Sequence, residues 1–314
     1  MNNFFKILSV FVFCVVLASC SKSDTVDVLP LRDYTEQYTT DINSIENYLK
    51  THFITVVNNP GANDDQNITL TLIPTGGTQI SIWDQTTYPL QSINVDKDGI
   101  VYKLYYLKLR EGSGATSKSP CNADGVLTAY KGQLLDGTVF DSNFYPQSYL
   151  YLSQVIRGWS ELFPKFKTGT YTANPDGTIT NTNFGAGVMF LPSGLGYYSQ
   201  STTAIPSYSP LIFNFKLFEV QRVDNDADGI YSFQEDINGD GYLRDNDVTF
   251  EDDTDQDGTP DFLDTDDDND GYTTKFELKY LVGGETFYYD FANIPLCTGT
   301  SNGKKRHLDA NCHN

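Results

Sequence analysis

Aromatic side chains and one carboxylate gather between residues 126 and 166 of the sequence. Residues 126–134 alternate as a strand does and Asp136-Gly137 is a turn signal, so Tyr130 and Phe140 should lie on adjacent antiparallel strands. A helical turn opened by residues 155 and 156 would bring Trp159 to the same face. The pattern predicts one concave site whose walls and lip are Tyr130, Phe140, Ile156, Trp159 and the carboxylate of Asp141.

A second group of reactive residues is acidic. Residues 224–277 hold 20 Asp and Glu against two basic residues, so most of the chain's net charge of −20 lies there. Residues 224–235 and 266–277 fit the pattern D-x-[DN]-x-[DN]-G-x5-E, and looser copies start at residues 236 and 253. Alternate carboxylates then point inward, the glycine permits a sharp turn, and the twelfth residue closes an oxygen shell that suits Ca²⁺. The expected ligands are Asp224, Asp226, Asp228, Glu235, Asp236, Asn238, Asp240, Asp247, Asp253, Asp255, Asp257, Asp264, Asp266, Asp268, Asp270 and Glu277.

The alternative for this segment is a solvated or disordered acidic run, but four copies in register favour binding loops. Glu235 directly precedes Asp236 and only Thr265 separates the last two loops, which leaves little room for the flanking helices of paired EF-hands. The run at 253–264 resembles thrombospondin type 3 calcium repeats. That resemblance implies structural calcium, whose removal should expand the segment by charge repulsion.

The remaining patterns predict the elements that hold the aromatic site. An apolar stripe at helical spacing indicates one amphipathic helix within residues 32–53. Strands are expected at 68–73, 79–83, 100–109, 184–190 and 211–220, with a surface hairpin around Asp176-Gly177.

Several motifs in order resemble FKBP-type peptidyl-prolyl cis-trans isomerases across about residues 101–222. They are Y-K-G-Q-L-L-D-G-T-V-F-D-S-N from Tyr130, V-I-R-G-W from Val155, L-P-S-G-L-G-Y from Leu191 and A-I-P-S-Y-S-P-L-I-F-N-F-K-L from Ala204. The resemblance implies an α+β fold, a twisted antiparallel sheet curved over one short helix. It also implies a proline pocket with Trp159 as its floor. Its implied walls, hydrogen-bonding groups and cap are Tyr130, Phe140, Asp141, Tyr149, Val155, Ile156, Tyr197, Ile205 and Phe213.

The chemistry implied by the resemblance needs no cofactor. Rotation about an X-Pro bond breaks amide resonance, a barrier of about 18–20 kcal/mol, and exchange is slow without help. A dry site that binds the twisted amide more tightly than the planar one accelerates the exchange. The implied partners are proline-containing polypeptide clients.

Two departures from the family pattern keep other functions open. Tyr198 stands where the family usually has glycine, and Pro164 cuts short the helix that carries Trp159. An aromatic cluster can also be an ordinary core. The alternative function is a non-catalytic, calcium-stabilised binding or adhesion lipoprotein that uses the same pocket.

The N-terminus predicts export. A positive charge and the apolar run 7–17 are typical of a signal peptide, and Leu17-Ala18-Ser19-Cys20 resembles a bacterial lipobox. Lipid attached to Cys20 would anchor the chain to a bacterial membrane, expected to be the outer membrane on its periplasmic or cell-surface side. Secretion after Ser19 without a lipid is the alternative. Nucleic acid is not an expected partner, because the chain lacks a basic face.

Cys297 and Cys312 could form a disulfide in an oxidising compartment, or contribute with His307 and His313 to a metal site that lacks standard zinc spacing. The predicted organisation is a signal peptide (1–19), a lipid-anchored tether with a helix and strands (20–99), an isomerase-like domain (100–222), acidic calcium-binding repeats (223–280) and a tail (281–314).

Overall fold

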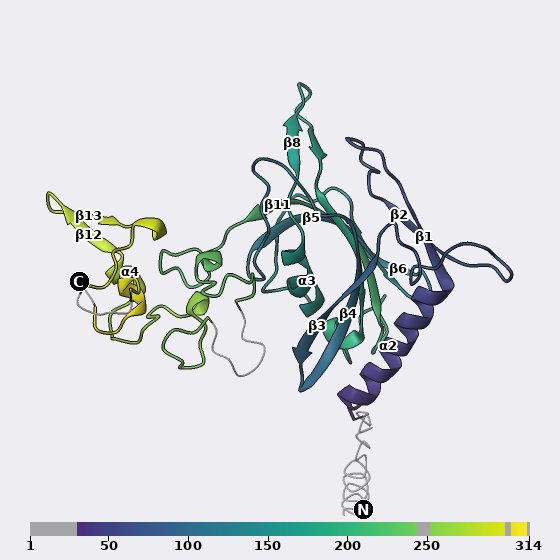
Figure 1. The fold of residues 1–314 in the computed structure, drawn as a ribbon, viewed down its shortest axis with the longest axis horizontal. Helices are drawn as coiled ribbons and strands as arrows, with labels where there is room; N and C mark the ends of the chain where they lie inside the picture. Colours follow the sequence, from purple (N-terminus) through teal and green to yellow (C-terminus); the bar gives the residue numbers. More distant parts are fainter. Residues whose placement is uncertain (1–29, 244–251, 299–302, 313–314) are drawn as a thin grey trace, which may run out of the picture. The chain divides into compact units, whose positions relative to one another are not determined.

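The computed structural model describes residues 30–243, 252–298 and 303–312. Its centre is a seven-stranded antiparallel sheet in which the strands follow the order β3-β4-β10-β11-β5-β6, with β7 paired to the start of β5 (Figure 1). The strands are β3 (Leu90–Lys97), β4 (Ile100–Arg110), β5 (Gly125–Leu134), β6 (Val139–Asn143), β7 (Leu150–Tyr151), β10 (Gly185–Leu191) and β11 (Leu211–Gln221). The predicted α+β class is confirmed.

One face of the sheet packs against the short helix α3 (Arg157–Leu162), which lies inside the curve of the sheet (Figure 1). Because side chains alternate along a strand, one set of strand residues faces this helix. On β11, Phe213, Phe215 and Leu217 join Trp159 and Leu162 of α3 in one buried cluster. The helix ends at Leu162 and a 3₁₀ turn, Phe163–Lys165, follows it and contains Pro164, so the helix is cut short as the proline predicts.

The other face packs against the long helix α2 (Tyr34–Thr51), which begins at the N-cap Asp33. Its apolar stripe, with Ile45 and Leu49 fully buried, meets alternate residues of β4 and β10 such as Leu107 and Phe190. The predicted helix is therefore confirmed, and it covers the sheet face opposite α3.

The N-terminal region differs from the prediction at one strand. β1 (His52–Val56) pairs with β2 (Ile68–Leu72), but residues 79–83 form no strand. Instead the amides of Ile82 and Trp83 donate to the carbonyls of His52 and Leu49, so this segment closes the C-terminal end of α2. The central sheet also begins at Leu90, ten residues before the predicted domain boundary at 100, because β3 pairs along β4.

Elements outside the central sheet are short. The hairpin β8 (Thr170–Ala173) and β9 (Ile179–Thr182) confirms the predicted turn at Asp176-Gly177. In the described part of residues 223–312 the longest helix is α4 (Thr274–Glu277), and β12 (Lys279–Val282) pairs with β13 (Glu285–Tyr288). Among the described residues no helix has the length and apolar character needed to cross a membrane.

Candidate functional site

The β5–β6 hairpin carries the polar end of the aromatic site. The Tyr130 hydroxyl donates to Asp141 Oδ2 at 2.7 Å, and Gly132 lies opposite Asp141 in the strand register. A Cβ at Gly132 would lie 2.5 Å from the ring of Phe140 and 2.8 Å from that of Phe213. The glycine is therefore what lets these two rings approach each other. Burial and the Asp141 carboxylate raise the pKa of Tyr130, so its hydroxyl remains a proton donor at neutral pH.

Trp159 is the floor of this aromatic group. Its ring meets those of Tyr130 and Phe213 edge-to-face at centroid distances of 5.1 and 5.3 Å and stacks on Phe163 at 5.1 Å. The Trp159 side chain is 3% exposed, and its indole Nε1 has no hydrogen-bond partner among the described residues. Edge-to-face packing with several neighbours holds the ring in one orientation.

Tyr197 and Ile205 reach the site from the segment between β10 and β11. The Ile205 amide is held by Thr202 Oγ1 at 3.0 Å, and the Ile205 carbonyl accepts from the Thr202 amide at 2.9 Å. Ile205 is 4% exposed, whereas Tyr197 is half-buried. The side chains expected as walls and cap, Tyr130, Phe140, Val155, Ile156, Tyr197, Ile205 and Phe213, all belong to the buried cluster that contains Trp159 or pack against it.

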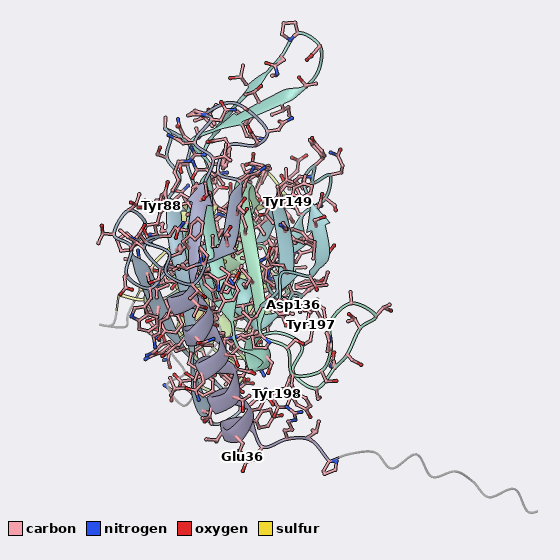
Figure 2. All side chains as sticks on the ribbon, turned by 90° about the vertical axis from the view of Figure 1, so that its right-hand side faces the viewer. Glu36, Tyr88, Asp136, Tyr149, Tyr197 and Tyr198 are labelled. Carbon is pink, nitrogen blue, oxygen red and sulfur yellow. A yellow bond between two sulfur atoms is a disulfide. The ribbon has the colours of Figure 1, made fainter. Side chains whose placement is uncertain are left out.

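Two expectations for the site are corrected. Helix α3 begins at Arg157, with Ile156 as its extended N-cap, so Val155 and Ile156 precede the helical turn that they were expected to open. Tyr149 is not part of the wall. It lies beside Gly125 at the start of β5, five residues along the strand from Tyr130, and Figure 2 shows Tyr149 and Tyr197 toward opposite ends of the sheet. The loop that follows β6 ends in β7, whose pairing with the start of β5 carries Tyr149 away from the site.

Helix α2 supplies residues that the sequence did not single out. Asp41 is 1% exposed and accepts from the Ser193 amide at 2.7 Å, the Ser193 hydroxyl at 2.5 Å and Gln37 Nε2 at 2.6 Å. Gln37 Nε2 also reaches the carbonyl of Tyr208 at 3.5 Å. These bonds fix both ends of the segment that carries Tyr197 and Ile205.

Tyr198, the residue that stands in place of the usual glycine, has a φ of +50°. That is the left-handed region, which costs most residues energy and which glycine enters freely. The Tyr198 ring stacks on Tyr34 at 4.7 Å and meets Tyr208 edge-to-face at 5.1 Å. The two ring contacts offset the backbone strain and attach the segment to the start of α2, where Figure 2 places Tyr198.

The four acidic loops share one backbone arrangement. In each, the amide of the sixth residue, a glycine, donates to the first carboxylate, as Gly229 does to Asp224 at 3.2 Å and Gly271 to Asp266 at 3.1 Å. The same bond links Gly241 to Asp236 and Gly258 to Asp253, and each glycine has a positive φ. The predicted repeat is thus one local structure used four times. The expected ligand Asp247 lies outside the described residues.

Several carboxylate oxygens within these loops are buried without a hydrogen-bond partner. They include both oxygens of Glu235 and one oxygen of Glu277, side chains that are 5% and 1% exposed. Burial, followed by the repulsion of neighbouring carboxylates, raises the pKa of Glu235 to about 10 and that of Glu277 to about 9. Three carboxylates of the first, third and fourth loops lie within 4.8 Å of one another in the sets Asp224–Asp226–Asp228, Asp253–Asp255–Asp257 and Asp266–Asp268–Asp270. Burying charged oxygens without partners is costly, and a hard cation would remove that cost.

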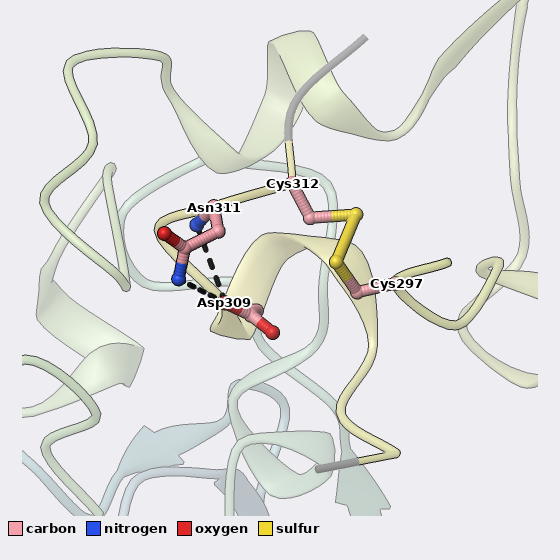
Figure 3. The surroundings of a disulfide bond; sticks show 4 residues. All are labelled: Cys297, Asp309, Asn311 and Cys312. Carbon is pink, nitrogen blue, oxygen red and sulfur yellow. Dashed lines mark hydrogen bonds between the residues drawn. A yellow bond between two sulfur atoms is a disulfide. The ribbon is translucent and has the colours of Figure 1, made fainter. Parts of the chain in front are cut away.

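The C-terminal cysteines form a disulfide between Cys297 and Cys312, the first of the two alternatives (Figure 3). In the loop that the disulfide closes, Asp309 Oδ1 accepts hydrogen bonds from the Asn311 amide at 3.2 Å and from Asn311 Nδ2 at 3.1 Å. Arg306 donates to the carbonyl of Lys279 at 3.2 Å, so the tail packs against the end of the fourth loop. Cys20, the expected lipid attachment site, lies outside the described residues.

Comparison with known proteins finds relatives that align with less than half of the chain. The chain is 33% identical over 139 residues to a probable FKBP-type peptidyl-prolyl cis-trans isomerase FkpA of Neisseria meningitidis serogroup B, covering 42% of this chain and 44% of that protein. It is 28% identical over 134 residues to FkpA of Escherichia coli K12, covering 42% and 41%, and 30% identical over 135 residues to the outer membrane protein MIP of Legionella longbeachae, covering 42% and 51%. The chain therefore spans less than half the length of the FkpA relatives.

A family model described as BamM C-terminal matches residues 225–304, which contain the acidic loops except for Asp224. Among solved structures, the crystal structure of FkpA from E. coli aligns at 19% identity over 69% of this chain and 71% of that chain, with a TM-score of 0.34. A Pseudomonas syringae peptidyl-prolyl cis-trans isomerase aligns at 17% identity over 62% of this chain and 99% of that chain, with a TM-score of 0.36.

Proposed function

We propose that the chain is a peptidyl-prolyl cis-trans isomerase that acts on X-Pro bonds of polypeptide clients. The observation that carries the proposal is the aromatic group around Trp159, closed at its polar end by the Tyr130–Asp141 hydrogen bond of 2.7 Å. Relatives that align with 42% of the chain are named as isomerases of this type.

The site would act by preferring the twisted amide. The rings of Trp159 and Phe213 offer the proline ring an apolar surface, and water excluded from that surface cannot stabilise the planar, more polar amide. Tyr197 is half-buried and Ile156 is the N-cap of α3. The hydroxyl of the first and the amide of the second would bind carbonyls of the client. Each tenfold acceleration requires about 1.4 kcal/mol of preferential binding, so a few such contacts suffice.

The acidic loops would bind calcium as structural ions. The residues fit that ion, because the loops present only oxygen ligands and keep several of them buried without protein partners. Calcium would balance the loop charge and thereby stabilise the segment, without taking part in isomerisation. The affinity expected of such exported sites is about 10⁻⁴–10⁻³ M.

Cys20 would carry lipid and attach the exported chain to a bacterial membrane, expected to be the outer membrane. The basis is the signal-like N-terminus and the lipobox-like Leu17-Ala18-Ser19-Cys20. A test is metabolic labelling with a fatty acid, in which the label should disappear on Cys20→Ser.

The test of the isomerase is the cis-to-trans relaxation of a short Phe-Pro peptide with the full chain in detergent, first with calcium and then with chelator. Tyr130→Phe and Tyr197→Phe should each reduce kcat/KM. The matched control is Tyr171→Phe, which should leave kcat/KM unchanged because Tyr171 is a 63% exposed side chain on the β8–β9 hairpin. A folded chain that binds proline peptides without accelerating the relaxation would instead be the non-catalytic binding lipoprotein.

A further inference from the structure

Three buried carboxylates meet between the first and the fourth acidic loop. Asp228 and Glu235 belong to residues 224–235 and Asp267 to residues 266–277, and one oxygen from each lies within 4.8 Å of the other two. The three side chains are 2%, 5% and 2% exposed. Each of the other carboxylate groups found among the described residues lies within a single loop. This group instead joins two loops that are about 30 residues apart in the sequence.

Five of the six carboxylate oxygens of this group have no hydrogen-bond partner among the described residues, and the sixth, Asp228 Oδ1, accepts from the Ile230 amide at 2.7 Å. Both oxygens of Glu235, both of Asp267 and Oδ2 of Asp228 are buried without a hydrogen bond. Unpaired carboxylates that are removed from water and face each other destabilise a folded chain, unless a cation lies between them.

Asp267 is not explained by the repeat pattern of its own loop, because it occupies the second position and the pattern takes ligands from the first, third, fifth and twelfth. In two other loops the side chain at the second position bonds to the ninth residue of the same loop. Asn225 Nδ2 donates to Ser232 Oγ at 2.8 Å, and Thr254 Oγ1 donates to Asp261 Oδ2 at 2.7 Å. The carboxylate of Asp267 makes no such bond, although its amide keeps the shared contact to Thr274 Oγ1 at 3.3 Å.

The two loops are already held at this distance by other contacts. Lys275 Nζ donates to the carbonyl of Ala227 at 3.0 Å. Beside it Ile230, Leu278 and Ile294 form a buried apolar cluster. The three carboxylates are therefore brought together by the fold, so that a cation would find the ligands preformed.

We propose that Asp228, Glu235 and Asp267 hold one calcium ion that fastens the fourth loop to the first. This inference rests on the proposed calcium binding of the loops and adds to it a ligand, Asp267, and a link between loops. The ligands are all carboxylate oxygens, which select a hard cation. Calcium fits better than magnesium, since ligands drawn from irregular loops seldom give the near-ideal octahedron that magnesium needs.

The first test counts ions by equilibrium dialysis of the full chain in detergent, followed by metal analysis. Asp267→Asn should weaken the binding of one calcium ion by at least about tenfold, because it removes one ligand and its charge. Glu235→Gln should weaken the binding of the same ion. The double variant, Asp267→Asn with Glu235→Gln, should therefore lose no more ions than Glu235→Gln alone. Asp290→Asn, an exposed aspartate of the tail, is the matched control and should bind as the wild type does.

The outcomes separate this inference from the proposed function. If the wild type binds calcium and Asp267→Asn binds the same number of ions with the same affinity, the link between loops is wrong while calcium binding stands. If the wild type binds no calcium, both fail.

A second measurement separates a ligand from a merely structural residue. In chelator Asp267→Asn should raise the melting temperature, because the chain no longer has to protonate or bury the Asp267 carboxylate beside two other carboxyl groups when it folds. In calcium it should lower the melting temperature relative to the wild type. A decrease of equal size in both conditions would overturn the proposal, since it would give Asp267 a role that does not depend on the ion.

Discussion

Asp41→Ala should loosen the segment that brings Tyr197 and Ile205 to the site. Asp41 is 1% exposed and accepts three hydrogen bonds, two of them from Ser193 and one from Gln37. Hydrogen bonds to a charged group contribute about 1.5–3 kcal/mol each, although they are not additive. Removing the acceptor also leaves the buried Ser193 amide without this partner. We expect the free energy of unfolding to fall by about 3 kcal/mol.

The assay is urea unfolding of the variant and the wild type, combined with hydrogen exchange of residues 192–210. The exchange protection of that segment should fall more than that of the sheet, and kcat/KM for a proline peptide should fall with it. Glu36→Ala, an exposed change on the same helix (Figure 2), should alter the free energy of unfolding by no more than about 0.5 kcal/mol. If the urea midpoint of unfolding of Asp41→Ala equals that of Glu36→Ala, the reasoning that α2 positions residues 192–210 is refuted.

Three further predictions concern the aromatic site, the loops and the tail. Gly132→Ala should cost about 1–3 kcal/mol by overpacking, seen in urea unfolding, and should lower isomerase activity, because its Cβ would lie 2.5 Å from Phe140. In chelator the chain should lose stability as the pH rises from about 7 to 9. Burial raises the pKa of Glu235 to about 10 and that of Glu277 to about 9, so in this pH range the folded state binds more protons than the unfolded state. Thermal unfolding at several pH values measures this, and calcium should reduce the dependence of stability on pH. A stability in chelator that rises with pH would contradict the prediction. Cys312→Ser should destabilise the tail by about 3 kcal/mol through the loss of a 15-residue loop constraint, measured by denaturant unfolding, and unchanged unfolding would show that packing alone holds the tail.

Much of the aromatic site was predictable because strand alternation and one turn signal determine which side chains share a face. Tyr130, Phe140 and Trp159 come from segments with clear periodicity, and they meet as expected. Tyr149 was misplaced because its position depends on the pairing of β7 with the start of β5, a contact that no local pattern encodes.

The role of α2 was hidden for a related reason. Gln37 and Asp41 are polar residues that recur four positions apart, and such a pair on an isolated helix is usually solvated. Their function appears only once Ser193 and Tyr208, more than 150 residues away, are placed beside them. The backbone arrangement of the acidic loops was predictable, since it depends on residues within each loop, whereas the contact of Asp267 with the first loop depends on tertiary packing.

Three hydrogen bonds between the acidic segment and the domain that holds the aromatic site each involve a main-chain atom. The Asn122 amide donates to the carbonyl of Gly241 at 3.1 Å, the Leu243 amide donates to Asn122 Oδ1 at 2.9 Å, and the Tyr242 hydroxyl donates to the carbonyl of Glu161 at 2.8 Å. Glu161 lies two residues after Trp159 on α3. None of these bonds engages a loop carboxylate, so they do not require a bound cation. The first and fourth loops hold several buried carboxylate oxygens without hydrogen-bond partners among the described residues, so these loops should loosen in chelator before α3 does. The proposed isomerase activity should therefore persist when calcium is removed.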